Sequence, residues 1–314
     1  MLYLTTRDHR DAFTAYRALT EDAAKDGGLY IPMRLPLFDQ ASLSPLVENP
    51  FSETVAAVLN QFFSANLNAW DIECCIGKDP LKLSVVGRKT LIAEVWHNYG
   101  RSYEYAVSSI SDRLLSPLKA PVSSWTRVAI GIAFAFGMFT ELCRNDIIDQ
   151  CDAIDVCVPD GDYSLPAAML YAKQMGLPIG KIIISSGANS AIWDLINHGQ
   201  MSTVLLNCVQ KLAMERLICC TVGQNEVVSY SAACDRHGVY SVPEDKMDAL
   251  PGVLFGSVVG KERIRSTIDN VYNSNGYVLS ENTALCYAGL QDYRAKTGQG
   301  GLAVLFGASR PESD

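Results

Sequence analysis

"VCVPDGDYSLPAAMLYAKQMGLPIGKIIISSGANS", residues 156–190, contains the pattern that decides the fold. It begins within the apolar run "IDVCV" (154–158), which is rich in β-branched residues and predicts a buried strand. A second run of this kind, "KIIIS" (181–185), follows after a segment with helical character. The stretch therefore predicts two neighbouring parallel strands joined by a tight loop and a helix.

Small and polar residues mark the ends of this predicted helix. Ser164 can cap its first turn, Pro166 can stand in that turn without loss of a hydrogen bond, and Gly176 can end the helix. Ligands of parallel sheets bind at the carboxyl ends of the strands. We therefore expect a ligand-binding position at the loop formed by residues 159–165.

Short apolar runs alternate with helical segments from residue 81 onward. This alternation predicts an α/β fold with a mainly parallel sheet, and the apolar segment 128–142 predicts a buried helix. Besides the two runs above, the predicted strands are "KLSVVG" (82–87), "TLIAEVWH" (90–97), "RLICCTVG" (216–223) and "GLAVLFGAS" (301–309).

The first 80 residues have a different pattern. "DAFTAYRALTEDAAKDGG" (11–28) and "FSETVAAVLNQFF" (51–63) place apolar residues at helical spacing, and Ser52 is the expected N-cap of the second helix. We predict a helical N-terminal domain over residues 1–80 and a reduced, mainly parallel sheet domain over residues 81–314.

Composition and charge narrow the class of protein. The chain has 314 residues, of which 48% are hydrophobic, so it can bury a sizeable core and is not disordered. Its net charge of −8 argues against general nucleic-acid binding, which needs a clustered basic face. The longest apolar run, 128–139, is too short to cross a bilayer, and no signal-peptide pattern is present. We predict a cytoplasmic protein without a membrane or nucleic-acid partner.

The cysteines and histidines do not form a recognisable metal or disulfide pattern. Most of the ten cysteines, Cys157 and Cys208 among them, fall inside apolar runs, which predicts reduced and buried thiols. None of the four histidines stands near a cysteine at zinc-site spacing. We therefore predict no metal site.

Several motifs, taken in order, resemble the threonine synthase family of fold-type II pyridoxal phosphate enzymes. The family opens with a Ser-Thr-Arg segment, a helix and an Asp-Gly-Gly-Leu-Tyr segment, and "YLTTRDHRDAFTAYRALTEDAAKDGGLYIP" (3–32) resembles this opening. Further similar segments are "EVWHNYGRSYEYAV" (94–107), "GYVLSENTALCYAGL" (276–290) and "FGASRP" (306–311). The resemblance implies a carbon–oxygen lyase that acts on a phosphorylated amino acid with pyridoxal phosphate.

The resemblance also implies which residue should anchor the cofactor. The family forms a Schiff base through a lysine in a segment that resembles His-Gly-Pro-Thr-x-x-Phe-Lys. Here that segment begins at His97, and the lysine position is Glu104. A carboxylate cannot form an imine, so the family's anchoring group is absent at this position.

The expected phosphate loop departs from the family as well. The loop that resembles the family's Gly-Asn-Phe-Gly-Asn pattern reads Gly161, Asp162, Tyr163, Ser164 and Leu165, and Asp160 precedes it. Two carboxylates beside a phosphate oppose its binding, so the loop is interpreted as vestigial. Gly161 follows Glu104 by only 57 positions, and we predict that most of the family's small mobile domain is absent.

Three hypotheses for function remain open. The first is a catalytically inactive, threonine synthase-like protein with a binding, scaffold or regulatory role and no confidently assigned cofactor. Its partner would be a small anionic metabolite or another protein. The second is a divergent active enzyme that uses His97, Glu104 and Asp162 as acid–base groups in a remodelled cleft. The third is a true pyridoxal phosphate enzyme whose imine lysine stands elsewhere in the chain.

Overall fold

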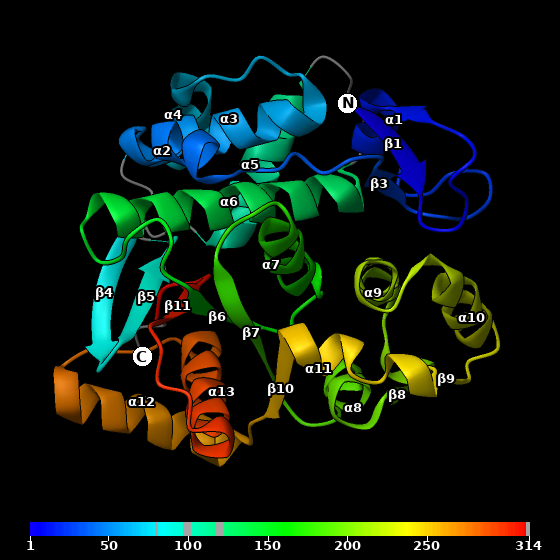
Figure 1. Ribbon diagram of the computed structural model, residues 1–314. Coiled ribbons are helices and arrows are strands. Elements are labelled where there is room, and N and C mark those ends of the chain that lie inside the picture. Colours follow the sequence, from blue (N-terminus) through cyan, green and yellow to red (C-terminus); the bar gives the residue numbers. More distant parts are fainter. Residues whose placement is uncertain (79–80, 97–101, 117–121, 312–314) are drawn as a thin grey trace.

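A six-stranded, mainly parallel sheet forms the centre of the protein in the computed structural model, which describes residues 1–78, 81–96, 102–116 and 122–311 (Figure 1). The strand order is β10-β7-β6-β11-β5-β4, and only the edge strand β4 runs antiparallel to its neighbour. The strands are β4 (Lys82–Gly87), β5 (Thr90–Glu94), β6 (Ile154–Pro159), β7 (Ile179–Ser186), β10 (Leu254–Val258) and β11 (Ala303–Gly307). This arrangement confirms the predicted α/β fold class.

Helices cover both faces of this sheet (Figure 1). On one face, α7 (Ser164–Gln174) packs against β6 and β7, and α6 (Ser124–Arg144) packs against α7. On the opposite face, α13 (Glu281–Thr297) lies across the central strands beside α12 (Lys261–Asn275). Burial on both faces explains why the central strands read as continuous apolar runs.

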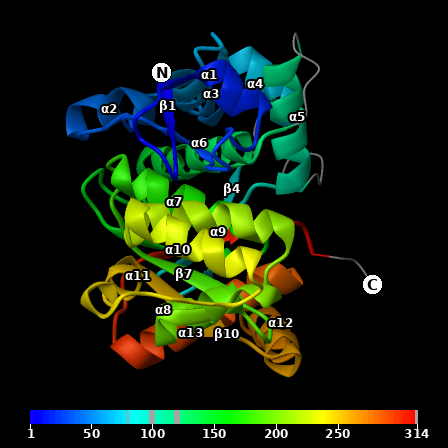
Figure 2. The same cartoon turned by 90° about the vertical axis from the view of Figure 1, so that its right-hand side faces the viewer.

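One predicted strand is wrong. Residues 216–221 of "RLICCTVG" form the end of the helix α9 (Cys208–Thr221), at whose start Asn207 and Gln210 form a reciprocal capping box. A short apolar run does not distinguish a strand from a turn of buried helix, and here the cap before it was the stronger signal. Figures 1 and 2 show α9 beside α7 and α10 (Gln224–Asp235).

The part of the protein that contains α9 and α10 also holds a small antiparallel pair of strands. In this pair β8 (Gln200–Ser202) faces β9 (Val239–Ser241). The helices α8 (Ala191–His198) and α11 (Ala249–Val253) lie next to this pair and to β10.

Residues 1–78 are mainly helical, but they also contain a three-stranded antiparallel sheet that the sequence did not predict. Its strand order is β2-β1-β3. The predicted helix near residue 13 is only α1, because the preceding Phe13 pairs with β1. The elements are β1 (Leu2–Thr5), β2 (Phe13–Thr14), α1 (Ala15–Thr20), β3 (Tyr30–Pro32), α2 (Gln40–Glu48), α3 (Phe51–Phe63) and α4 (Ala69–Ile76).

The start of α3 also differs from the prediction in detail. Pro50 is its N-cap, whereas Ser52, the expected cap, is buried in the first turn. The fixed backbone angle of proline suits the entry to a helix, and the polar side chain is not needed there. The predicted boundary at residue 80 falls between α4 and β4, and buried side chains from both sides of it share one core.

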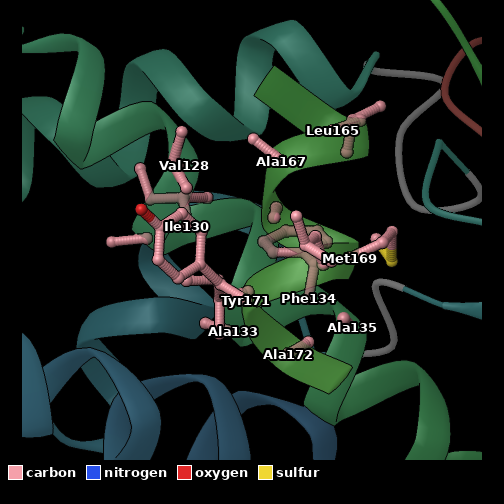
Figure 3. Close-up of a cluster of buried hydrophobic side chains, with 14 of the residues drawn as sticks. Val128, Ile130, Ala133, Phe134, Ala135, Leu165, Ala167, Met169, Tyr171 and Ala172 are labelled. Atoms are coloured by element: carbon pink, nitrogen blue, oxygen red, sulfur yellow. The ribbon is translucent and has the colours of Figure 1, made fainter. Parts of the chain in front are cut away.

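The helix α6 connects the N-terminal helices to the sheet domain. It is long and apolar enough to span a membrane, yet 89% of its apolar window is buried inside the protein. Its side chains interlock with those of α7 in one buried cluster (Figure 3). On its other side it packs against α3, where Phe51 and Phe134 meet edge to face at 5.3 Å between ring centroids.

Gly137 in α6 allows the close approach of α3. A Cβ atom at this position would lie 2.6 Å from the buried ring of Phe51. We expect Gly137→Ala to lower the free energy of unfolding by about 1–3 kcal/mol, although alanine is the better helix former by about 1 kcal/mol. Urea denaturation measures this difference. Gly252→Ala in α11, where a Cβ meets no atom within 4 Å, is the matched control and should leave stability unchanged or slightly higher.

Candidate functional site

The predicted loop lies where β6 ends and α7 begins, at the carboxyl edge of the sheet. Its backbone turns sharply, with φ of +46° at Gly161 and +64° at Tyr163. The Tyr163 amide donates to the carbonyl oxygen of Asp160 at 2.8 Å, and the Gly161 amide donates to the Asp160 side chain at 2.8 Å. The loop is therefore held by its own hydrogen bonds.

Asp162 accepts two hydrogen bonds from the first residue of α7. The Ser164 amide donates to its Oδ1 at 2.9 Å, and the Ser164 hydroxyl donates to the same oxygen. Ser164 is thus not the N-cap that was predicted. That position is Tyr163, whose side chain makes no capping bond, so Asp162 supplies the acceptor in its place. The predicted end of α7 before Gly176 is confirmed.

A cavity of about 440 Å³ opens beside this loop. It brings Glu104 together with Asp160, Gly161 and Asp162 of the loop. Tyr163 is buried below and does not line it. The described residues that line the cavity are Ser102, Tyr103, Glu104, Pro159, Asp160, Gly161, Asp162, Ser164, Leu165, Asn282, Ala308 and Ser309.

Other predicted segments converge on the same cavity. Asn282 comes from the segment 276–290, and Ala308 and Ser309 come from the segment near the C-terminus. These segments lie far apart in the sequence but meet because β6 and β11 are neighbouring parallel strands. His97 lies outside the described residues.

Arg127 is the charged residue that sequence reasoning missed. Its Nη1 lies 2.7 Å and 3.0 Å from the two carboxylate oxygens of Glu104, and its Nε lies 3.4 Å from an oxygen of Asp162. Burial lowers the pKa of Arg127, but the two carboxylates outweigh that effect and raise it. Its only sequence signal was its position at the start of the long apolar run of α6.

Asp160 is the carboxylate of the cavity whose negative charge is balanced least by neighbouring groups. Burial raises its pKa, while hydrogen bonds from Ser186 and the backbone oppose the rise, and no cation is among the groups that act on it. Its side chain is half-buried.

Tyr103 lines the cavity, but its hydroxyl lies in the packed interior near Gly131 of α6. It is buried and has no hydrogen-bond partner among the described residues. Its ring is held edge to face between Phe134 and Phe306, at centroid distances of 5.4 Å and 5.1 Å. Burial raises its pKa, and the charges of Arg127, Asp162 and Glu104 act on it more weakly.

The described residues do not fit pyridoxal phosphate, the cofactor that the resemblance implies. They place no lysine in the cavity lining, and three carboxylates stand there instead. Two unit charges of like sign about 4 Å apart repel by roughly 4 kcal/mol at an effective dielectric of 20, whereas a helix N-terminus attracts an anion by roughly 1 kcal/mol. The amides of Gly161, Tyr163 and Ser164 are also already bonded within the chain.

The N-terminal sequence matches a known protein family. Residues 2–79 match the family model described as "Threonine synthase N terminus". Threonine synthase-like 1 of Pongo abelii is 23% identical over 175 residues, which are 52% of this chain. The match spans 23% of the length of that relative.

Solved structures share the fold over nearly the whole chain. Threonine synthase from yeast superposes with a TM-score of 0.79 at 15% identity, covering 99% of this chain and 87% of the yeast chain. The PLP-bound threonine synthase from Brucella melitensis gives a TM-score of 0.76 at 15% identity, covering 99% of this chain and 89% of its own. The chain therefore carries an N-terminal segment similar to that of threonine synthases, and as a whole it has the fold of these solved structures.

Proposed function

We propose that this threonine synthase-like protein lacks the pyridoxal phosphate chemistry of its family and uses the fold in a binding, scaffold or regulatory role. One observation carries the proposal. Glu104 stands where the resemblance places the anchoring lysine, and its carboxylate is paired with Arg127 through two contacts of 2.7 Å and 3.0 Å.

The chemistry of this pair supports the proposal. A carboxylate has no nitrogen with which to form an imine, so it can neither anchor the cofactor aldehyde nor return a proton as a lysine amine does. The phosphate loop points to the same conclusion, because Asp160 and Asp162 line the position at which a phosphate would stand.

The acid–base alternative has less support. Glu104 and Asp162 both pair with Arg127, so each carboxylate of that hypothesis already has a partner within the chain. The third member of that hypothesis, His97, lies outside the described residues. We therefore place the inactive protein ahead of a divergent enzyme.

The charge of the cavity bears on the kind of partner that we propose. A small anionic metabolite would meet three carboxylates in the cavity, so we favour a protein partner over the metabolite.

We propose a cytoplasmic location, because all ten cysteines are free thiols. Cys157 is buried as predicted, while Cys208 is exposed, because it opens α9 at the protein surface.

Mixing the purified protein with pyridoxal phosphate tests the loss of cofactor chemistry. We expect no saturable internal-aldimine absorption band, and borohydride reduction followed by peptide mass spectrometry should find only the scattered lysine labelling that the urea-unfolded chain also gives. A saturable band with one lysine labelled specifically in the folded protein would defeat the proposal.

A gain-of-function variant tests the position of Glu104. In a background of Asp160→Asn and Asp162→Asn, which removes the two charges that repel the phosphate, we expect Glu104→Lys to be labelled by pyridoxal phosphate and borohydride several-fold more than Asp112→Lys. The second variant places an exposed lysine on the same helix, α5 (Tyr103–Leu115), outside the cavity. Mass spectrometry at positions 104 and 112 gives the ratio. Equal labelling at the two positions would show that Glu104 does not mark the anchoring position.

The charge state of Asp160 should be visible in the pH dependence of stability. Because burial raises its pKa in the folded protein, its ionised form costs stability above that pKa and costs nothing below the unfolded value of about 3.9. We expect Asp160→Asn to raise the free energy of unfolding relative to the wild type at pH 7 and to give a smaller gain near pH 3. Urea titrations at both pH values measure this, with exposed Asp112→Asn as the control. An equal gain at both pH values would contradict the assignment.

A further inference from the structure

A second hollow, of about 400 Å³, lies between α4 and the first turn of α5. The two helices pack side by side there (Figure 2). Of the described residues, this hollow shares Ser102 alone with the cavity beside the β6 loop, and it contains none of the three carboxylates of that cavity. It is therefore a separate candidate site.

A link between the two helices holds the walls of this hollow in place. Asn68 and Asp71 form a reciprocal capping box at the start of α4. Arg113 of α5 donates to the buried side chain of Asp71 at 2.6 Å and 3.0 Å, and these hydrogen bonds lower the pKa of Asp71. The hollow is thus formed by two helices that are fixed against each other.

Two aromatic side chains stand at this hollow instead of in the core. Trp70 is 69% exposed and Tyr105 is 40% exposed, and both line the hollow. The buried side chains of Val95 and Ala106 line it as well. Large aromatic rings usually bury most of their surface, and ligand pockets are lined mainly by aromatic and apolar side chains. This part of the hollow suits an apolar or aromatic group.

The hollow also contains one charge of each sign. Glu73 and Lys78 both line it, and no ion pair joins the two within the described part of the chain. Glu73 is half-buried and accepts from the Ser52 hydroxyl at 3.3 Å, whereas Lys78 is exposed. A ligand that carries both an ammonium group and a carboxylate can pair with both residues.

We propose that this hollow binds a free α-amino acid with a large apolar side chain. The ammonium group of the ligand pairs with Glu73, its carboxylate pairs with Lys78, and its side chain lies against Trp70 and Tyr105. The volume of about 400 Å³ falls within the range of about 300–1,000 Å³ that is typical of ligand pockets. A phosphate would meet Glu73 as a like charge, whereas a zwitterion satisfies both charged residues.

This inference goes beyond the proposed function, because it assigns a ligand to a site apart from the cofactor cavity. Calorimetric titration of the purified protein with L-phenylalanine tests it. We expect saturable binding with a dissociation constant of about 1 mM or lower. N-acetyl-L-phenylalanine lacks the positive charge and L-phenylalaninamide lacks the negative charge, so each should bind at least about fivefold more weakly than L-phenylalanine.

Two variants assign the charges separately. Glu73→Gln should weaken the binding of L-phenylalanine and of its amide and leave that of the acetylated form unchanged. Lys78→Gln should weaken the binding of L-phenylalanine and of the acetylated form and leave that of the amide unchanged. Trp70→Ala should weaken the binding of all three. Glu53→Gln is the matched control, because Glu53 lines a neighbouring groove with Trp70 but not this hollow.

Three results would overturn the inference. The first is no saturable binding of L-phenylalanine by the wild type, and the second is equal binding of all three ligands by the wild type. The third is binding that neither Glu73→Gln nor Lys78→Gln weakens in proteins with the wild-type circular dichroism spectrum. The comparison of ligands needs the wild type alone, so it stands even if a variant does not fold. None of these results depends on imine formation, which the pyridoxal phosphate experiment measures separately.

Discussion

The close packing of α6 against its neighbours is the constraint on which the rest of the structure depends. Gly137 lets α3 approach from one side, and Gly131 lets α7 approach from the other, where a Cβ would lie 2.7 Å from Ala168. Interiors this dense leave little freedom for the backbone. Arg127, in the first turns of α6, is consequently held in place near the cavity, where it pairs with Glu104 of α5 and with Asp162 of the loop before α7.

The position of Arg127, more than the energy of its ion pairs, explains how charges are arranged in the cavity. The Glu104 side chain is 64% exposed, and exposed ion pairs contribute only about 0–1 kcal/mol to stability. Arg127 therefore does little to stabilise the fold. Its effect is local. By pairing with Glu104 and Asp162, it holds both carboxylates near the N-terminus of α7.

The sequence predicted the elements whose pattern is local and strong. The unit from β6 to β7 was recovered with its loop, because β-branched runs, a proline in the first turn and a helix-ending glycine all agree there. The strand predicted at 216–223 was wrong for the opposite reason. A few apolar residues fit both the strand and the helix period, and the helix cap that decides between them, Asn207, lies nine positions before residue 216. The pairing of β1 with β3 depends on contacts across 25 or more positions, which no local pattern encodes.

The candidate site was predictable only in part. Glu104 and the loop were found because a resemblance supplied their positions, and the cavity brings them together. Arg127 was not, because its contacts arise from where α5 and α6 lie next to each other rather than from a motif. The same limit applies to Asp162, whose two bonds to Ser164 are visible only once the backbone turn is known.

The burial of α6 has a consequence for synthesis of the protein on the ribosome. This helix finds its partners both earlier in the chain, in α3, and later, in α7, which ends at Gln174. Until the later segment has left the exit tunnel, the apolar face of this 21-residue helix that packs on α7 stays uncovered in the nascent chain. Such surfaces aggregate readily, so we expect the half-made polypeptide to depend on chaperones more than its finished form does.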